Sequence, residues 1–536
     1  MGRTERVCVV GAGMSGLIAM KELLEKGHDV TCYEQTEREG GVFNYPTGVA
    51  YDDLRLTVSQ HFMCFTWMPP PPREKRELWT RGRYAEYLHA FAERFGLLPH
   101  IHFGTTVTAV APTLDGRVRV HVHDAGTQLF DSVAICRGAF RASAPRLPRI
   151  EGLDTFPGLV AHSGAYKDPE PFRGLRVLCV GMGETSADIT LQISNVAAAC
   201  TLSMRTFPEI IKRYRGPDRR TTDVDSTRLF HWMSVEQRAE FYTFKRSFRA
   251  TRTLSEHDRV VFEWNRRSGG RRSLQKNDDV VANVVNGRIQ VRAPAAVARI
   301  EGDTVIFNDQ SSLEVDAIMF STGYEESSIP SGWLTNVEIP DVRRLYKHAF
   351  HPDLGRRVAL FGWARPRQGG LPVLSELLAR HFALLCSGER ELPAKSEMTR
   401  VIDEDCAREE DFFANSKHTR TLVHYTRYAD DLAELVGCLP NLEAYLDDPE
   451  LLTHLVCSSN IGLSYRLQGP DAFPEAARAA CVSAPIADPY LAIDRFVEHA
   501  LSARLGPETA HRAAGVIRTY LTTHTTDMPS AADWES

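Results

Sequence analysis

The chain has 536 residues, a net charge of −6, and ordinary fractions of apolar (43%) and charged (25%) side chains, so it is a globular protein with room for roughly two to four domains. The negative charge excludes a general attraction to nucleic acid or anionic membranes, and no apolar stretch approaches the roughly 20 residues of a membrane span. The 11 cysteines show no metal-ligand spacing. A soluble, cytoplasmic protein with reduced thiols is expected.

The first 45 residues predict a strand, a glycine-rich turn, a helix and a second strand. The turn Gly11-Ala12-Gly13-Met14-Ser15-Gly16 follows the apolar run 7–10, and the second strand ends at Glu34. Such a turn brings a pyrophosphate to a helix N-terminus, and an acid about 20 residues on binds ribose hydroxyls but repels a 2′-phosphate. This unit predicts a site for FAD or NAD and excludes NADP.

Further along the chain, the Pro-rich segment 69–72 is expected to be extended, and residues 84–95 have helical spacing. Strands are predicted at 101–110, 117–123 and 131–136.

A second unit of the same kind begins near residue 175. Its turn, Gly181-Met182-Gly183-Glu184-Thr185-Ser186, follows the strand 177–180, and the next strand ends in Arg205. A guanidinium there suits a 2′-phosphate, with Lys212 and Arg213 near in sequence. We interpret the first site as FAD and the second as NADPH; two merely structural strand-to-helix turns are the alternative.

Residues 209–276 interrupt the alternation of strands and helices and carry 17 Lys and Arg against 9 Asp and Glu. A helical insertion with a solvated basic face is favoured over a nucleic-acid or membrane-surface patch. Strands return at 289–307 and 315–320, and from about 392 onward the pattern is mostly helical.

Two motifs carry a resemblance to a known family. Residues 156–167, FPGLVAHSGAYK, match the pattern FxGxxxHxxxY(K/P), and residues 320–324 read FSTGY. Over about residues 5–480 the chain thus resembles the flavin-containing monooxygenases. Tyr166 stands where the related Baeyer–Villiger enzymes usually carry Trp, which favours the plain flavin monooxygenases. Shorter matches are Leu345-Tyr346-Lys347, Glu376, Ala379-Arg380, Asn441-Leu442, Asp448-Pro449, Tyr465-Arg466-Leu467 and Gly469-Pro470.

The resemblance implies an α/β fold with two Rossmann-like dinucleotide-binding domains, the FAD domain being interrupted by the NADP domain, and a mostly helical C-terminal extension. The expected parts are 1–168 (FAD, first part), 169–322 (NADPH), 323–480 (FAD, second part) and 481–536 (helical extension).

The resemblance also implies a reaction: NADPH reduces FAD, O2 forms a C4a-(hydro)peroxyflavin, and one oxygen passes to a nitrogen or sulfur of a small molecule, as in N,N-dimethylaniline monooxygenase, here in a biosynthetic pathway. The expected partners are that molecule and O2, without nucleic acid or a membrane span; a homodimer stays open.

Family residues transfer onto this sequence as follows. The FAD site is predicted to contain Gly11, Ala12, Gly13, Ser15, Gly16, Glu34, Gln35, Gly40, Gly41, Val42, Phe43, Val107 and Gly138. The NADP site is predicted to contain Gly181, Gly183, Ser186 and Arg205. Thr322, Gly323 and Tyr324 are expected to line the passage between the domains, and His162 and Tyr166 to have structural or hinge roles.

Two departures from the family bear on specificity. Thr57 stands where many members place an Asn close to the flavin, and it is the catalytic candidate. Arg137 replaces a common Thr beside the FAD and meets either an anion or solvent. These changes leave a second hypothesis for the reaction. It is oxygen insertion next to a carbonyl, either by Baeyer–Villiger oxidation or by decarboxylation of an α-keto acid. A disulfide reductase would need a CxxC pair that the sequence lacks, and a degenerate flavoprotein conflicts with two intact glycine turns.

Overall fold

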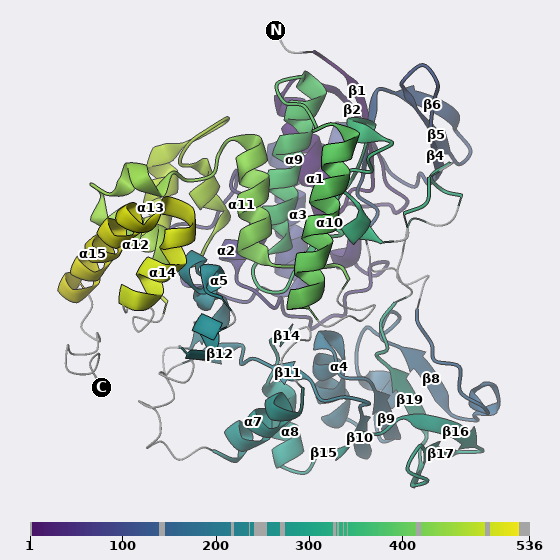
Figure 1. Cartoon of the computed structure of the whole chain (residues 1–536). Helices are drawn as coiled ribbons and strands as arrows, with labels where there is room; N and C mark the ends of the chain where they lie inside the picture. The colour runs from purple at the N-terminus through teal and green to yellow at the C-terminus, as the bar shows by residue number, and fades with distance from the viewer. Residues whose placement is uncertain are drawn as a thin grey trace.

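Two five-stranded parallel sheets organise the protein (Figure 1). The computed structural model describes residues 3–138, 145–215, 219–234, 236–240, 255–268, 274–324, 329, 332–335, 337–339, 341–413, 420–487 and 494–524. The first sheet has the order β20-β7-β1-β2-β3, and the second has the order β15-β10-β9-β19-β8. Because β20 follows the whole second sheet in sequence, one dinucleotide-binding fold interrupts the other. The predicted α/β class with two Rossmann-like domains is confirmed.

The first sheet contains β1 (Arg6–Val10), β2 (Asp29–Tyr33), β3 (Ile101–His102), β7 (Ser132–Ile135) and β20 (Val358–Leu360). The helices α1 (Met14–Glu25), α2 (Gln60–Met63), α3 (Arg81–Arg94) and α9 (Leu371–Ser387) belong to the same half. Helix α9 packs along α1, and its residues Pro372–Ser387 are all buried. A side sheet is formed by β4 (Val107–Pro112), β5 (Val118–Val122) and β6 (Gly126–Phe130).

The strand predicted over 101–110 is divided in the structure. β3 ends at His102 and β4 begins at Val107, because Gly104 takes a positive φ of 62° between them. The two short strands consequently join different sheets.

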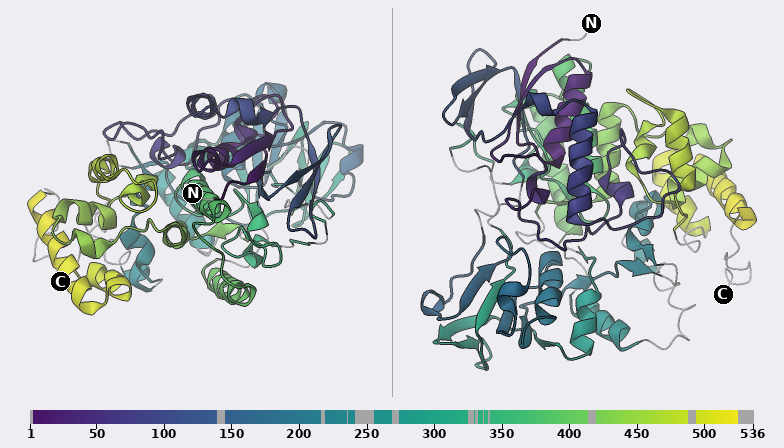
Figure 2. Two further views of the ribbon diagram at one scale, coloured as in Figure 1. Left: turned by 90° about the horizontal axis from the view of Figure 1, so that it is seen from above. Right: turned by 180° about the vertical axis from the view of Figure 1, so that it is seen from behind.

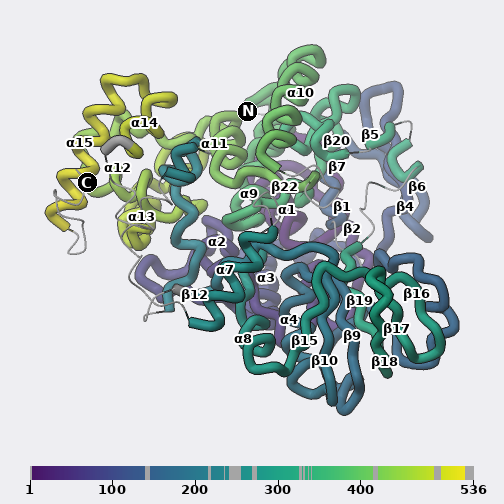
Figure 3. The backbone as a smooth tube through the Cα atoms, turned by 60° about the horizontal axis from the view of Figure 1, so that its bottom comes forward, coloured from purple at the N-terminus to yellow at the C-terminus, as the bar shows by residue number. Residues whose placement is uncertain are grey.

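The second sheet contains β8 (Leu159–His162), β9 (Arg176–Val180), β10 (Ala199–Ser203), β15 (Ile289–Arg292) and β19 (Ala317–Phe320). Figure 3 shows β15, β10, β9 and β19 side by side, as their pairing requires. The helices α4 (Glu184–Ser194), α7 (Glu256–Ser268) and α8 (Asp279–Val285) pack with this half. A side sheet is formed by β16 (Val297–Glu301), β17 (Thr304–Phe307) and β18 (Ser312–Glu314).

The last part of the chain is helical, with α10 (Lys395–Phe412), α11 (Tyr425–Val436), α12 (Pro449–Cys457), α13 (Pro474–Ser483), α14 (Asp494–Leu505) and α15 (Pro507–His524). Helices α12 to α15 share a separate apolar core, and they lie on the opposite side of the molecule from the β4–β6 sheet (Figures 1 and 2). Among the helices that the structure describes, none is long and apolar enough to cross a membrane.

The insertion at 209–276 is only partly described: 216–218, 235, 241–254 and 269–273 lie outside. Its described part contains helices α5 (Arg228–Trp232) and α7 but also short strands, β11 (Glu209–Ile210), β12 (Tyr214–Arg215), β13 (Arg220–Thr221) and β14 (Leu274–Gln275). Leu229 of α5 is buried in the core of the C-terminal helices. The insertion therefore connects the second sheet to the far end of the chain. A two-stranded pair, β21 (Arg365–Pro366) and β22 (Leu422–Val423), lies in the first half.

Candidate functional site

The first glycine turn requires glycine at two of its positions. Gly11 has a φ of 101°, and a Cβ there would lie 2.7 Å from the Cys136 carbonyl oxygen. A Cβ on Gly16 would lie 1.9 Å from the Gly11 oxygen. Gly13 precedes the first residue of α1, so the free N–H groups of the helix start at this turn. The backbone is shaped as a pyrophosphate cradle requires.

A second glycine pair closes on the first turn. The Gly40 N–H donates to the Ala12 oxygen over 3.0 Å, and a Cβ on Gly41 would lie 3.1 Å from the Gly13 Cα. Val42 and Phe43 continue as a short 3-10 turn, and Phe43 packs edge-on against the Tyr84 ring. The GG stretch therefore packs on the first glycine turn at the start of α1, and its contact with the flavin stays a prediction.

Glu34 lies at the mouth of the first turn and is buried. Its Oε2 accepts the Ala12 N–H over 2.8 Å, and its Oε1 accepts the N–H and hydroxyl of Thr36. A carboxylate fixed there fits the ribose of FAD. Gln35 beside it is exposed.

Three other predicted FAD residues have contacts of their own. The Ser15 hydroxyl contacts the Ser375 hydroxyl over 3.0 Å and so joins α1 to α9. The Val107 oxygen accepts from the Trp333 Nε1 over 3.1 Å. Gly138 follows β7 with a φ of 74°. Their contacts with FAD stay predictions.

The second turn repeats the first. Gly181 has a φ of 106° and donates its N–H to the Ser203 oxygen over 2.9 Å. The Ser186 hydroxyl donates to the Gly181 oxygen over 2.7 Å, which closes the turn where the first unit uses a glycine. Beyond its chain neighbours, no atom of the described residues lies within 4 Å of a Cβ built on Gly183, so the cradle is open. This geometry fits NADPH.

Arg205 is exposed just beyond β10, and no hydrogen bond or ion pair engages it in the described chain. Lys212 and Arg213, expected nearby, are occupied elsewhere. Lys212 pairs with Asp258 at 2.5 Å, and the buried Arg213 pairs with Asp188 at 2.8 Å.

The crossing between the two halves is built around His162. Its Nε2 lies 2.9 Å from the Gly323 oxygen, and its Nδ1 accepts the Gly164 N–H. The ring is therefore held as the Nε2–H tautomer, and burial lowers its pKa. The Tyr324 ring meets His162 edge-on, and the Thr322 hydroxyl donates to the Arg146 oxygen. The Tyr166 hydroxyl donates to the Gln192 Oε1 over 2.8 Å. These contacts fix the chain at the crossing, and the structural or hinge roles of His162 and Tyr166 stay predictions.

Thr57 is half-buried, and its hydroxyl makes no hydrogen bond among the residues the structure describes. The loop around it is fixed by its neighbours: the Leu56 N–H donates to Trp79, and the Ser59 N–H donates to Asp223 Oδ2 over 2.6 Å. Asp223 belongs to the insertion, so this loop touches the NADP half directly. The catalytic role of Thr57 stays a prediction.

Sequence reasoning missed the buried polar groups between the halves. The Tyr51 hydroxyl donates to Asp188 over 2.6 Å, and Asp188 also holds Arg213. Within the NADP half, the Lys276 backbone N–H donates to Glu184, and burial raises the pKa of this carboxyl to about 7. No short motif marks these residues, because their partners are distant in sequence.

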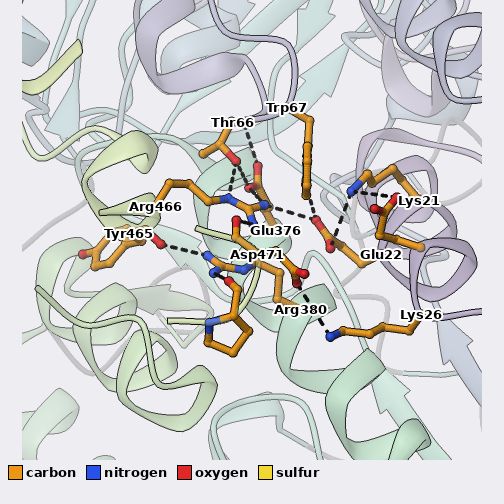
Figure 4. A network of polar contacts seen from close by, with 12 residues as sticks. Lys21, Glu22, Lys26, Thr66, Trp67, Glu376, Arg380, Tyr465, Arg466 and Asp471 are labelled. Carbon is orange, nitrogen blue, oxygen red and sulfur yellow. Dashed lines mark hydrogen bonds and ion pairs between the residues drawn. The ribbon is translucent and has the colours of Figure 1, made fainter. Parts of the chain in front are cut away.

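Four of the residues in the shorter family matches, Glu376, Arg380, Tyr465 and Arg466, belong to one core polar network (Figure 4). The network also contains Lys21, Glu22, Thr66 and Trp67. Arg466, fully buried, pairs with Glu376 at 2.7 Å and with Glu22 at 3.3 Å. Its Nε donates to the Thr66 hydroxyl over 2.8 Å. Arg380 donates to the oxygens of Tyr465 and Pro470. The network joins α1, α9 and residues 462–466 through buried contacts.

The family model "Flavin-binding monooxygenase-like" matches residues 4–488. A 4-hydroxybenzoate brominase (decarboxylating) from Pseudoalteromonas luteoviolacea is 36% identical over 93% of this chain and 96% of its own. Dimethylaniline monooxygenase [N-oxide-forming] 2 from Macaca mulatta is 30% identical over 89% of this chain and 91% of its own.

Among solved structures, the S-allyl-L-cysteine S-oxygenase from Allium sativum shares the fold, with a TM-score of 0.59 and 22% identity over 89% of this chain and 98% of its own. With two dinucleotide-binding sheets and a family match over nearly its whole length, the chain belongs to the flavin-binding monooxygenase-like family and uses FAD and NADPH.

Proposed function

We propose that this protein brominates a phenolic acid of the 4-hydroxybenzoate type and releases its carboxylate as CO2. The observation that carries the proposal is the 36% identity to a decarboxylating 4-hydroxybenzoate brominase over 93% of this chain, against 30% for an amine-oxygenating relative. The reaction balances with one NADPH, one O2, one bromide and three protons. NADPH and bromide give two electrons each, both oxygen atoms end in water, and a C–Br bond replaces the bond from the ring to the carboxylate.

Bound FAD would supply the transfer of electrons from NADPH to O2. The chain's own residues would hold and shield the cofactors. The glycine turns at Gly13 and Gly183 would cradle the pyrophosphates. Glu34 would bind the ribose hydroxyls of FAD, and Arg205 would bind the 2′-phosphate of NADPH. The hydrogen bond from Tyr51 to Asp188 joins the two halves. Thr57 offers one hydroxyl donor on the loop that touches both halves.

Oxygen transfer to nitrogen or sulfur stays a second candidate, supported by the relative that forms N-oxides. Oxygen insertion next to a carbonyl is a third. The brominase relative is named as decarboxylating, and the decarboxylation of an α-keto acid also removes a carboxylate, although the substrates differ.

One competition experiment separates these reactions. The holoenzyme is incubated with NADPH, 18O2 and sodium bromide together with 4-hydroxybenzoate, N,N-dimethylaniline, a thioether and an aromatic α-keto acid, and products are analysed by mass spectrometry. We expect a bromophenol with the two-isotope pattern of bromine, no 18O in the organic product, and CO2 in equal amount. Formation of an 18O-labelled N-oxide, sulfoxide or ester without any brominated product would overturn the proposal.

A further inference from the structure

A pocket of about 200 Å³ opens where three distant segments of the chain meet. Its walls come from α2 with the Pro-rich loop (His61 and residues 72–76), from the insertion (Arg219–Thr221 and Val224) and from the end of α13 (residues 483–485). A single water occupies only about 30 Å³ in the liquid, so this volume suits a molecule of several heavy atoms rather than one ion.

Cations dominate the lining of this pocket. Its positively charged residues are Arg73, Lys75, Arg76, Arg219 and Arg220, and its one acidic residue is Glu74. The Glu74 carboxylate pairs with Arg83, which is not among the lining residues, at 3.4 Å. The pocket therefore keeps an excess of positive charge.

Arg76 is the innermost of these cations. Both of its terminal nitrogens are buried, and neither has a hydrogen-bond partner in the described ranges; the same holds for the Nδ1 of His61 beside it. Buried donors of a charged group are rarely left unpaired, because they lose their hydration without a replacement. Two unpaired guanidinium nitrogens in one plane match the two oxygens of a carboxylate.

Asp223 is the acidic group that acts on Arg76, yet it does not satisfy the guanidinium. Its Oδ2 accepts the Ser59 N–H over 2.6 Å, and its Oδ1 accepts the Thr221 hydroxyl over 2.5 Å. No ion pair joins Asp223 to Arg76 in the part of the chain described. Burial lowers the pKa of Arg76, and the Asp223 charge offsets part of that effect.

The wall beyond the cations is apolar. It is formed by Pro72, Val224, Ala484 and Pro485. A ligand with an anionic head and a small apolar body would satisfy both walls at once. We propose that this pocket binds a small organic carboxylate, with its carboxylate on Arg76 and His61 and its body against the prolines. This binding claim goes beyond the proposed reaction, because it holds whether or not the bound acid is brominated.

The test is calorimetric titration of the FAD-bound protein, without NADPH or bromide, using benzoate, 4-hydroxybenzoate, phenol, inorganic phosphate and bromide as probes. We expect both acids to bind and phenol, which lacks the carboxylate, to bind at least tenfold more weakly. Arg76→Gln should weaken the acids by about 10- to 100-fold, the range of a charge-assisted hydrogen bond. Arg119→Gln, which removes the same charge from an exposed position in β5, should leave binding unchanged.

A rim variant protects the test against a misfolded Arg76→Gln. Lys75→Gln changes an exposed side chain of the pocket and should weaken the acids by a few-fold, with a smaller loss at high salt. The proposal is overturned if the acids bind Arg76→Gln, or both Arg76→Gln and Lys75→Gln, with the affinity of the wild type. It is also overturned if phenol binds as well as benzoate, or if only phosphate and bromide bind. A protein that binds the acids but yields no brominated product would refute the proposed reaction and leave this site standing.

Discussion

A cation can bind a 2′-phosphate only if no other group of the protein already neutralises it. Arg205, exposed just beyond β10, has no hydrogen bond or ion pair among the described residues. We predict that Arg205→Gln raises the KM for NADPH by about tenfold or more, the size of one charge-assisted contact, while the KM for NADH changes less than twofold. Steady-state kinetics with both nucleotides check this. Unfolding should be unaffected, since the side chain is exposed. Equal losses for the two nucleotides would remove Arg205 from the site.

Glu34 is a carboxylate whose two oxygens both accept backbone N–H groups. Glu34→Gln places an amide N–H₂ against one of those donors, and an unsatisfied buried group costs about 1–3 kcal/mol. We predict a roughly tenfold or larger loss of FAD affinity, measured by the ratio of flavin to protein after dialysis. Glu37→Gln, at an exposed position nearby, is the matched control and should retain flavin. Full retention by Glu34→Gln would show that the carboxylate does not hold the ribose.

Residues within one short turn could be predicted from the sequence, and residues that act across domains could not. Gly11, Gly16 and Glu34 belong to a local pattern whose spacing is fixed by a strand and a helix. Arg76 and Asp223 approach each other because the insertion contacts the Thr57 loop. Neither segment contains a sequence pattern that predicts this contact. Arg213 shows the opposite error, because nearness in sequence to Arg205 did not place it at the phosphate.

At the scale of elements, the core polar network fixes α1 against α9 and residues 462–466. Burial raises the pKa of Glu22, and Arg466 opposes that rise. Arg466→Met removes the cation that pairs with Glu376 at 2.7 Å and leaves Glu22 with Lys21 at 3.9 Å. Removing one partner of a buried pair costs about 3–5 kcal/mol. We predict that loss in the free energy of unfolding by urea denaturation.

The control for this variant is Arg400→Met on α10, which breaks two ion pairs, with Glu397 and Glu404, whose side chains are all about half exposed. Exposed pairs are worth about 0–1 kcal/mol, so this change should be small. An equal effect of the two variants would mean that the network contributes no more than a surface pair.

Helix α9 shows why some elements escape sequence patterns. Apart from Leu371 its residues are buried, so no polar stripe marks a helical period, and the sequence analysis did not predict it. The helix α3 has one buried face and was predicted over 84–95, close to its observed Arg81–Arg94. Amphipathic elements are visible in a sequence, and wholly buried ones are less so.

At the scale of the molecule, the fold depends on contacts that close over very long stretches of chain. β20 pairs with β7 after the whole second sheet has intervened. The family resemblance predicted this interruption, but composition and periodicity alone did not. The contacts between the insertion and the C-terminal helices were not predicted, although Leu229 of α5 lies in the core of those helices. The domain boundaries at 168, 322 and 480 stay predictions.

The junction between the insertion and the first half contains two buried histidines, His231 of α5 and His424 before α11, whose ring nitrogens lie 3.4 Å apart. Burial and the nearby Arg238 and Arg367 lower the pKa of His424 to about 3 and that of His231 well below its usual value. An unfolded histidine titrates near 6.5, so between about pH 6.5 and 3 the unfolded chain binds more protons and stability falls as pH falls.

Each such histidine adds a slope of up to about 1.4 kcal/mol per pH unit in this window. We predict that His424→Phe, which cannot take up a proton, loses about 1 kcal/mol less stability than the wild type between pH 6 and 5, measured by urea denaturation at each pH. The buried His61 and His381 have pKa values lowered to about 4. They contribute the same pH dependence of stability to the wild type and to His424→Phe. His511→Phe changes a ring that is 78% exposed and should leave the wild-type slope intact. Parallel stability curves for His424→Phe and the wild type would mean that His424 is not held neutral, and that acid does not act on this junction.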